Sequence, residues 1–272
     1  MPDESTLTPC KPVLPVAPYL GGKRNLAPRV IDRLREIPHT TYAEPFVGMG
    51  GVFLRRPFRA RAEVINDLSQ DVATLFRYLQ RHYEALMGEL QWKLTSRAEF
   101  ERLVAAEPSS LTDLERASRF LYLQRTNFGG KVSGRHFGVA PDRPARFDVH
   151  VLGPMLAEVH ERLSSVVIEC LPYGEFISRY DRPMTLFYLD PPYQGHENDY
   201  GRGLFGPDDF AVLAEQLAGL RGRFLLSLND TPVVREVFAR FEMQEVEVAY
   251  TVASRGDARG RRGELLISGP GR

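Results

Sequence analysis

The sequence Thr-Leu-Phe-Tyr-Leu-Asp-Pro-Pro-Tyr, residues 185–193, joins an apolar run of strand length to an acid, two prolines and an aromatic side chain. The prolines have no backbone donor and a fixed φ, so a strand must stop before them and the chain must turn rigidly. In open α/β sheets, ligands bind beyond the carboxyl ends of the strands. The stretch therefore predicts a buried strand over 184–189 that presents Asp190 and Tyr193 at a ligand-binding edge.

Such a turn suits the methylation of an exocyclic amine on a nucleic-acid base. The lone pair of that amine is conjugated into the ring, which makes the nitrogen a poor nucleophile. The Asp190 carboxylate and the Pro191 carbonyl would accept its two N–H groups and favour a pyramidal nitrogen, while Pro192 completes the rigid turn. Tyr193 would stack on the base for about 1–3 kcal/mol, once the base is flipped out of the duplex. The alternative is a structural turn with an incidental acid.

The composition is that of an ordinary globular protein. The chain has 272 residues, enough for one large α/β domain with or without an insertion. Its 35 basic and 35 acidic residues cancel, which argues against coating nucleic acid by bulk charge but allows a local basic face. Cys10 and Cys170 are too few for a disulfide framework and lack metal-ligand spacing. With no membrane-span run and no signal pattern at the start, we expect no metal, no membrane and a cytoplasmic location.

A glycine pair precedes the first predicted helix. Residues 19–23 read Tyr-Leu-Gly-Gly-Lys, and a helical pattern follows over 24–36. Gly21 and Gly22 would let the backbone approach a ligand closely, and Lys23 could then reach an anion or a carboxylate. An ordinary loop is the alternative for this feature alone.

A second glycine cluster lies in the first strand–turn–helix unit. Residues 41–51, Thr-Tyr-Ala-Glu-Pro-Phe-Val-Gly-Met-Gly-Gly, predict a strand that runs into a glycine-rich turn and a helix. Gly48 and Gly50 would let a bound nucleoside lie against the backbone. The next predicted strand, 62–65, leads into Asp67, an acid about 20 residues past the glycines, where ribose hydroxyls are bound in such folds. Asp67 is equally suited to cap the following helix.

An insert separates the second predicted strand from the third. Three helical patterns exceed what a simple crossover needs; they span 71–90, 96–106 and 111–125. A basic, aromatic and glycine-rich segment follows, and residues 125–150 carry five Lys/Arg against two acids. We therefore predict an inserted, mostly helical lobe over 75–149 that ends in a loop touching the partner. A plain surface loop is the alternative.

The α/β alternation resumes after the insert, while residues 1–17 are predicted to form a flexible leader. Polar, glycine-rich residues 194–206 are a candidate lid over the site, and an arginine-rich loop covers 255–262. The remaining predicted elements are helices over 151–163, 174–180, 208–220 and 231–240, strands over 166–170 and 223–228, and a hairpin of 242–249 with 263–268.

In this order the motifs resemble those of the Dam-like adenine-N6 DNA methyltransferases, whose cofactor motifs precede the recognition insert and the catalytic motif. The resemblance runs from Tyr19 to about Ser268, and its motifs are residues 19–23, 44–50, 66–67, 190–193 and the closing strand 262–267. It implies a Rossmann-like sheet built from 18–74 and 150–270, with 75–149 as the target-recognition lobe. The implied activity is site-specific transfer of a methyl group from S-adenosylmethionine to the N6 amine of a flipped-out adenine in double-stranded DNA.

The resemblance also implies roles for individual residues. The implied catalytic residues are Asp190, Pro191, Pro192 and Tyr193. The implied cofactor-binding residues are Tyr19, Gly21, Gly22, Lys23, Glu44, Phe46, Gly48, Gly50, Asp67 and Asp190. The candidates for DNA contact are Arg125, Asn127, Lys131 and Arg135. Phe-Gly-Gly-Lys at 128–131 stands where the family commonly has Asn-Gly, so a GATC target is not implied.

Several alternatives stay open. N4-cytosine methylation uses the same amine chemistry, although the motif order and an acid at position 190 favour adenine. A catalytically idle relative would bind DNA or the cofactor as a regulator, but it has no chemical need of Asp190 and Tyr193. A protein or RNA substrate is disfavoured by the size of the insert. We expect a bacterial or phage-encoded, nucleoid-associated monomer or weak dimer, either solitary or paired with a restriction endonuclease.

Overall fold

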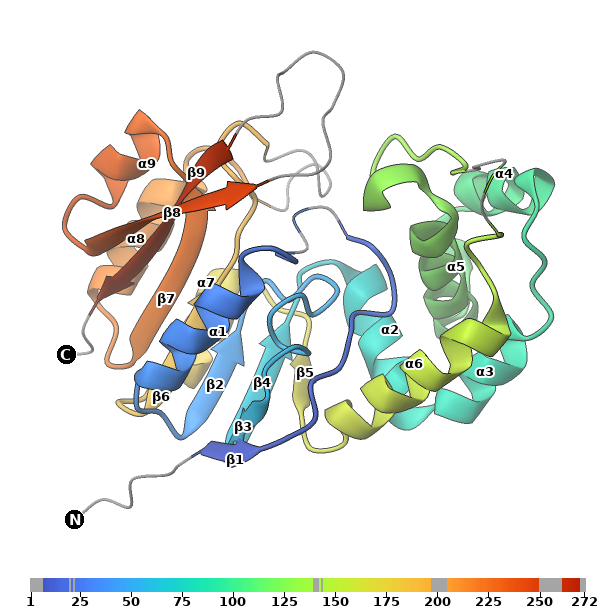
Figure 1. Ribbon diagram of the computed structural model, residues 1–272, viewed down its shortest axis with the longest axis horizontal. Helices are drawn as coiled ribbons and strands as arrows, with labels where there is room; N and C mark the ends of the chain where they lie inside the picture. Colours follow the sequence, from blue (N-terminus) through green and yellow to red (C-terminus); the bar gives the residue numbers. More distant parts are fainter. Residues whose placement is uncertain are drawn as a thin grey trace.

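The computed structural model describes residues 7–19, 21, 23–138, 142, 144–196, 205–249 and 261–269. Within them, a seven-stranded sheet has the order β5-β4-β2-β6-β7-β9-β8 (Figure 1). Strands β5 to β7 are parallel, and β9 runs antiparallel between β7 and β8. This arrangement confirms the predicted Rossmann-like sheet. The strands are β2 (Thr41–Glu44), β4 (Ala62–Asn66), β5 (Val167–Glu169), β6 (Thr185–Leu189), β7 (Arg223–Asn229), β8 (Glu242–Ala249) and β9 (Arg261–Gly269).

Helices cover both faces of the sheet, which is why β6 is apolar along its whole length. Leu186 and Tyr188 of β6 pack into one hydrophobic cluster, with α1 (Ala27–Glu36) and the inserted helices. Phe187 and Leu189, which point to the other face, pack into a second cluster. That cluster contains α7 (Tyr173–Tyr180), α8 (Asp209–Ala218) and α9 (Pro232–Val237).

The insert is helical, as predicted, and shares the first hydrophobic cluster with the sheet. The predicted single helix over 71–90 is wrong in detail, because the chain leaves helical geometry at His82 and forms two helices. The predicted lobe boundary at residue 75 falls inside the first of them, so that helix belongs to both the sheet domain and the lobe. The helices are α2 (Gln70–Arg81), α3 (Tyr83–Leu90), α4 (Arg97–Ala105), α5 (Asp113–Thr126) and α6 (Val149–Leu163).

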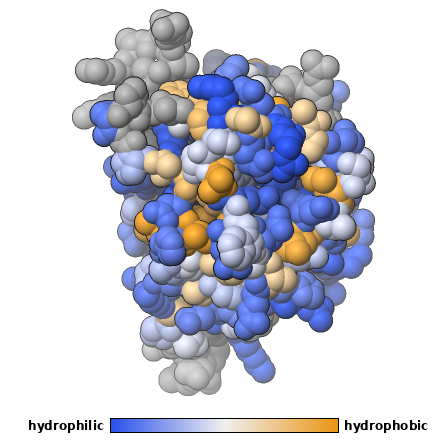
Figure 2. Space-filling model, turned by 90° about the vertical axis from the view of Figure 1, so that its right-hand side faces the viewer, coloured by the Kyte–Doolittle hydropathy of each residue, from blue (hydrophilic) through white to orange (hydrophobic). Residues whose placement is uncertain are grey.

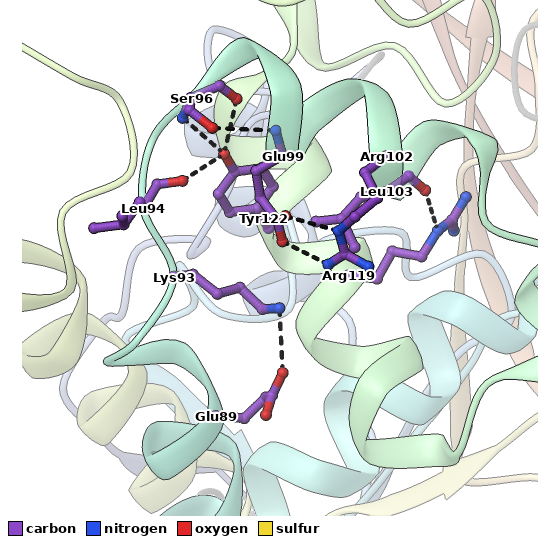
Figure 3. A network of polar contacts seen from close by, with 9 residues as sticks. All are labelled: Glu89, Lys93, Leu94, Ser96, Glu99, Arg102, Leu103, Arg119 and Tyr122. Carbon is purple, nitrogen blue, oxygen red and sulfur yellow. Dashed lines mark hydrogen bonds and ion pairs between the residues drawn. The ribbon is translucent and has the colours of Figure 1, made fainter.

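Polar contacts hold the insert together around α5 (Figure 3). The Tyr122 hydroxyl of α5 donates to the Leu94 carbonyl at 2.9 Å, which fixes the connection between α3 and α4. Arg119 donates to the Leu103 carbonyl at 2.6 Å and satisfies the end of α4. Thr112 and Glu115 form a reciprocal capping box at the start of α5. These contacts make α5 the frame of the lobe.

The outer face of the lobe is mostly hydrophilic, with hydrophobic groups scattered between polar ones (Figure 2). Trp92 and Leu94, between α3 and α4, are 80% and 78% exposed. An isolated β-bridge between Asn127 and Phe137 closes the loop that these two residues bound. This loop lies at the same end of the molecule as the carboxyl ends of the parallel strands (Figure 1). No helix among the described residues is long and apolar enough to cross a membrane.

The predicted flexible leader is wrong for residues 7–17. Strand β1 (Leu7–Pro9) pairs antiparallel with β3 (Phe58–Ala60), an element that the sequence did not reveal. Val13 and Val16 are buried in the first cluster, so burial of apolar surface outweighs the entropy of ordering the segment. Residues 1–6 lie outside the described part of the chain.

A buried network of ion pairs contacts β4. Glu63 of β4 accepts from Arg56 at 2.5 Å and from Arg162 of α6 at 2.5 Å. Arg56 also lies over the Tyr42 ring, 3.5 Å from its centroid. Burial alone would raise the pKa of Glu63, but the two guanidinium groups outweigh it and hold that pKa below its ordinary value. The network joins the turn before β3 to β4 and α6, and its Glu63–Arg162 pair spans 99 residues of sequence.

Candidate active site

Asp190 lies partly buried in a polar cluster beyond the end of β6. Its Oδ1 atom is 2.9 Å from the Lys23 ammonium and accepts from the Ser227 hydroxyl of β7 at 3.0 Å. Tyr188 of β6 contacts the same hydroxyl, 3.0 Å away. Burial raises the pKa of Asp190, and the Lys23 and Ser227 contacts oppose that shift. The prolines end β6 where the sequence predicted, and the parallel neighbours bring these groups to one edge.

Tyr193 is held by polar contacts at both its hydroxyl and its ring. Its hydroxyl donates to Glu264 Oε2 of β9 at 2.6 Å and accepts a hydrogen bond from Lys23. The Lys23 ammonium also lies over the ring, 3.9 Å from the centroid. Burial raises the pKa of Tyr193 well above its ordinary range, and the nearby carboxylates act in the same direction. Stacking of a base on Tyr193 stays a prediction.

Lys23 is placed by an unusual backbone conformation. Its φ of 50° lies in the left-handed region, which costs energy for a residue with a side chain. The Lys23 carbonyl accepts from the amides of Leu26 and Ala27, at 3.0 and 2.7 Å, and so begins the turn that leads into α1. The neighbouring Gly21 has φ 70°, whereas Gly22 lies outside the described residues. This strained start of the helix directs the lysine toward Asp190.

The glycine turn after β2 lies against Tyr19. Gly48 has φ 50°, and a Cβ atom built there would lie 2.9 Å from Tyr19 Cε1. Asp67 ties this turn to the next helix, because Oδ2 accepts from the Gly48 amide and Oδ1 from the Ser69 amide, each at 2.9 Å. Burial raises the pKa of Asp67 to about 6. Gly50 has φ 73°, and a Cβ atom built there would lie 2.8 Å from Leu54 Cγ.

Gly48→Ala tests this turn. We expect the KM for S-adenosylmethionine to rise about tenfold or more, because the new methyl group must displace the Tyr19 ring and the backbone conformation disfavours alanine. Steady-state kinetics with the cofactor varied would measure it. Gly134→Ala is the matched control, since that glycine also has a positive φ but has open space around its Cβ direction. Equal KM values in the two variants would contradict the role in cofactor binding that the resemblance implies for this turn.

Glu44 occupies a more enclosed position than expected. The residue is 2% exposed, and its carboxyl accepts from the Tyr42 hydroxyl at 2.5 Å. Burial raises the pKa of Glu44 to about 8, while the Tyr42 hydroxyl and the Arg56 charge oppose the shift. These contacts give Glu44 a structural role in β2, and cofactor binding by this residue stays a prediction.

Phe46 belongs to an aromatic group that the sequence did not reveal. Its ring lies 5.6 Å from Tyr173 and 5.9 Å from Phe205, between ring centroids. Phe46 follows β2, Tyr173 follows β5 and Phe205 precedes α8, so the group joins two strand ends to the start of a helix. The sequence carried one signal for this group, an aromatic residue soon after each of two predicted strands.

Two asparagines brace the loops at this edge. Asn66 donates to the carbonyls of Pro45 and Leu171, and accepts from the Leu171 amide at 2.8 Å. Asn229 exchanges two hydrogen bonds with the backbone of Gln194, each 3.0 Å long. Ser227 and Glu264 are the other missed residues, and both were visible as polar side chains inside apolar strand patterns. Residues 197–204 of the predicted lid and 255–260 of the basic loop lie outside the described chain.

The four candidates for DNA contact differ in position. Lys131 is exposed on the 127–137 loop. Asn127 is fully buried and bonds to the Lys131 carbonyl and the His136 amide, so it organises the loop and its predicted direct DNA contact is not supported. Arg125 donates to the Arg146 and Val16 carbonyls at 3.2 and 3.3 Å, which favours a structural role. Arg135 is largely enclosed, and burial lowers its pKa.

The lobe directly contacts the segment that precedes α1. Gln124 of α5 donates to the Pro18 carbonyl at 3.3 Å and to the Gly130 carbonyl at 3.2 Å. A Cβ atom at Gly130 would lie 2.9 Å from the Tyr19 amide nitrogen. The loop of the lobe therefore packs against the segment that carries Tyr19 and Lys23.

Comparison with known proteins identifies the family. Residues 19–252 match the family of D12 class N6 adenine-specific DNA methyltransferases, and the chain belongs to it. It is 28% identical over 272 residues to the DNA adenine methylase of Salmonella typhi, covering 91% of this chain and 92% of that protein. The DNA adenine methylase of Escherichia coli (strain K12) gives 28% over 262 residues, with 91% and 92% covered. Type II methyltransferase M.CviBI of Paramecium bursaria Chlorella virus NC1A gives 22% over 238 residues, with 87% and 90% covered.

The family settles the class of reaction. The protein is an enzyme, an adenine-specific DNA methyltransferase, which confirms the predicted family, activity and fold class. The cytosine-specific alternative and the idle regulator are therefore not retained. Methyltransferases of such families generally use S-adenosylmethionine as the methyl donor.

Proposed function

We propose that this chain transfers the methyl group of S-adenosylmethionine to the N6 amine of an adenine flipped out of duplex DNA, at one short target sequence. The observation that supports it most is the partly buried Asp190 carboxylate, held by Ser227 just beyond the end of β6 and followed by the rigid Pro-Pro turn. A neutral exocyclic amine needs an acceptor of this kind, placed before the reaction starts.

The residues at the sheet edge fit the proposed cofactor. Because Gly48 has no side chain, the Tyr19 ring packs directly against the turn, where a Cβ atom would lie 2.9 Å from Tyr19 Cε1. The Asp67 carboxylate at the end of β4 suits ribose hydroxyls, and the Phe46 group offers aromatic surface to a purine. We assign Tyr19, Gly21, Lys23, Gly48, Gly50 and Asp67 to this binding site. Bound there, the cofactor supplies an electrophilic methyl group.

Asp190 performs two tasks in this mechanism. Its carboxylate and the Pro191 carbonyl accept the two N–H groups of the amine, which turns the nitrogen lone pair outward and orients it for in-line attack. As the nitrogen gains the methyl group it loses a proton, and Asp190 is the nearest acceptor. Burial raises the pKa of Asp190, which makes it a better proton acceptor than an exposed carboxylate. Tyr193 supports the base from the side.

Purified protein tests this function directly. Duplex DNA incubated with the enzyme and S-adenosylmethionine should yield N6-methyladenine on nucleoside mass spectrometry, and a single-stranded or RNA substrate should yield far less. N4-methylcytosine in place of methyladenine would refute the proposed base. Methylation of RNA in preference to DNA would refute the proposed polymer.

Lys131 is the DNA contact that the geometry supports best. We expect Lys131→Ala to weaken duplex binding without changing the Kd of the cofactor, and to reduce the slope of log Kd against log salt by about 1, because one phosphate contact is lost. Fluorescence anisotropy at several salt concentrations would measure this. Lys11→Ala is the control, since that exposed lysine pairs with Glu158. An unchanged salt slope in Lys131→Ala would remove the loop from the DNA interface.

The bacterial and viral relatives support a further proposal about the setting. We place the activity on bacterial or phage DNA in the cytoplasm, either as a solitary enzyme or beside a cognate restriction endonuclease, as the type II relative suggests. A monomer or weak dimer stays our prediction.

A further inference from the structure

Lys23 occupies the position that the target amine has to reach. Its ammonium is 2.9 Å from Asp190 Oδ1 and 3.9 Å from the centroid of the Tyr193 ring. These are the two groups proposed to bind the amine and the base. The lysine side chain is 4% exposed, so it cannot simply swing into bulk water without moving its surroundings. Lys23 therefore imitates the incoming substrate, as a cation bonded to the acceptor and placed over the ring.

A second carboxylate lies within reach of the same ammonium. Glu264 Oε2 of β9 is 3.9 Å from Lys23 Nζ, and it accepts the Tyr193 hydroxyl at 2.6 Å. Glu264 is 1% exposed. Its other oxygen, Oε1, accepts no hydrogen bond from the part of the chain that the structure describes. Hydrogen bonds thus run from Lys23 to Tyr193 and on to Glu264, with a free buried acceptor at the end.

We infer that Glu264 is a positioning residue that takes over the Lys23 ammonium from Asp190 when the target adenine enters the site. This inference rests on the proposed function of Asp190 as the acceptor of the amine. It goes beyond the role of Asp190, because the displaced Lys23 ammonium needs a second partner inside the protein.

The energetic reason is the cost of an unpaired buried charge. An ammonium without a carboxylate partner in a buried site is strongly destabilised. Without Glu264, the substrate would have to displace Lys23 from Asp190 against that penalty. With Glu264 in place, Lys23 moves from one carboxylate to another across a short distance, and Tyr193 stays fixed by its hydroxyl. Asp190 is then free to accept the amine. The arrangement also keeps the acceptor neutralised while no base is bound.

A structural role for Glu264 makes a different prediction from this exchange. If Glu264 only anchored Tyr193, it would need an acceptor of the right length but no charge. Glu264→Gln keeps the length and the acceptor and removes the charge, whereas Glu264→Asp keeps the charge and shortens the side chain. The two variants therefore separate the roles, and both are small changes that the β9 position should tolerate.

The experiment measures kcat/KM for duplex DNA, the Kd of S-adenosylmethionine and the unfolding midpoint in these variants, each in the wild-type and in the Lys23→Met background. In the wild-type background we expect Glu264→Gln to lower kcat/KM for DNA about tenfold or more, and Glu264→Asp to be the more active of the two. The Kd of the cofactor and the unfolding midpoint should change little. With Lys23→Met, the effect of Glu264→Gln should shrink to about threefold or less, since no ammonium remains to be moved.

The inference would be overturned by an equal loss from Glu264→Gln in both backgrounds, or by a glutamine variant more active than the aspartate variant. Failure of the proposed function itself looks different, because the wild-type protein would then form no N6-methyladenine. An active wild type with a fully active Glu264→Gln variant refutes the exchange alone.

Discussion

We expect Asp190→Ala to abolish methyl transfer while binding of the cofactor remains detectable. Loss of one preorganised acceptor costs about 10²–10³-fold in rate, and here the same carboxylate also takes the proton from the amine. The variant additionally leaves the Lys23 ammonium with Glu264 as its remaining carboxylate neighbour among the described residues. Transfer of a labelled methyl group to duplex DNA measures the rate, and equilibrium dialysis with labelled cofactor measures binding.

Ser227→Ala is the matched control for this result. It removes the hydroxyl that donates to Asp190 Oδ1 but keeps the carboxylate. We expect a loss of about tenfold at most, because one hydrogen bond contributes about 0.5–1.5 kcal/mol. Near-native activity of Asp190→Ala, or a larger loss from Ser227→Ala than from Asp190→Ala, would refute Asp190 as the acceptor.

Glu63→Gln has the largest expected effect on stability. The change leaves two buried guanidinium groups, Arg56 and Arg162, without their shared carboxylate. Removing one partner of a buried ion pair costs about 3–5 kcal/mol. Urea unfolding at neutral pH should show a loss of this size in the free energy of unfolding. The exposed pair of Arg33 and Glu36 provides the control, since Glu36→Gln should cost less than about 1 kcal/mol.

The same prediction has a pH dependence. The two arginines hold the pKa of Glu63 below its ordinary value of 4.5 in the folded protein. A carboxyl group with a lowered pKa stabilises the fold at pH values above the ordinary one, and that contribution is lost as the pH falls through the folded-state value. The difference in unfolding free energy between wild type and Glu63→Gln should therefore narrow below about pH 4.5. A difference in unfolding free energy that stays constant down to the lowest pH at which the protein is folded would contradict the role of the network.

The sheet was predictable from sequence because its signals are local. An apolar run followed by Asp-Pro-Pro-Tyr defines the end of β6, and glycines define the turn after β2. The break at His82 was missed because the apolar spacing continues across it. The order in residues 7–17 was missed because β1 pairs with β3, about fifty residues away, and proline-rich composition concealed the buried Val13 and Val16.

The difference between local motifs and long-range contacts also explains which site residues could be predicted. Lys23, Asp67 and Asp190 each belong to a short motif, so sequence alone could name them. Glu264 comes from β9, and its nearness to Lys23 and Tyr193 depends on the pairing of β9 with β7, which sets Glu264 opposite Asn229. The burial of Asn127 was not predictable, because composition does not reveal which polar residue of a loop turns inward.

Modification-sensitive long-read sequencing of DNA from cells that express this chain tests the central claim most directly. Cells that express Asp190→Ala to the same level are the control. We predict N6-methyladenine at one short recurring motif with the wild-type chain and none with the variant. Methyl groups on cytosine, or the same adenine pattern in both samples, would contradict the account.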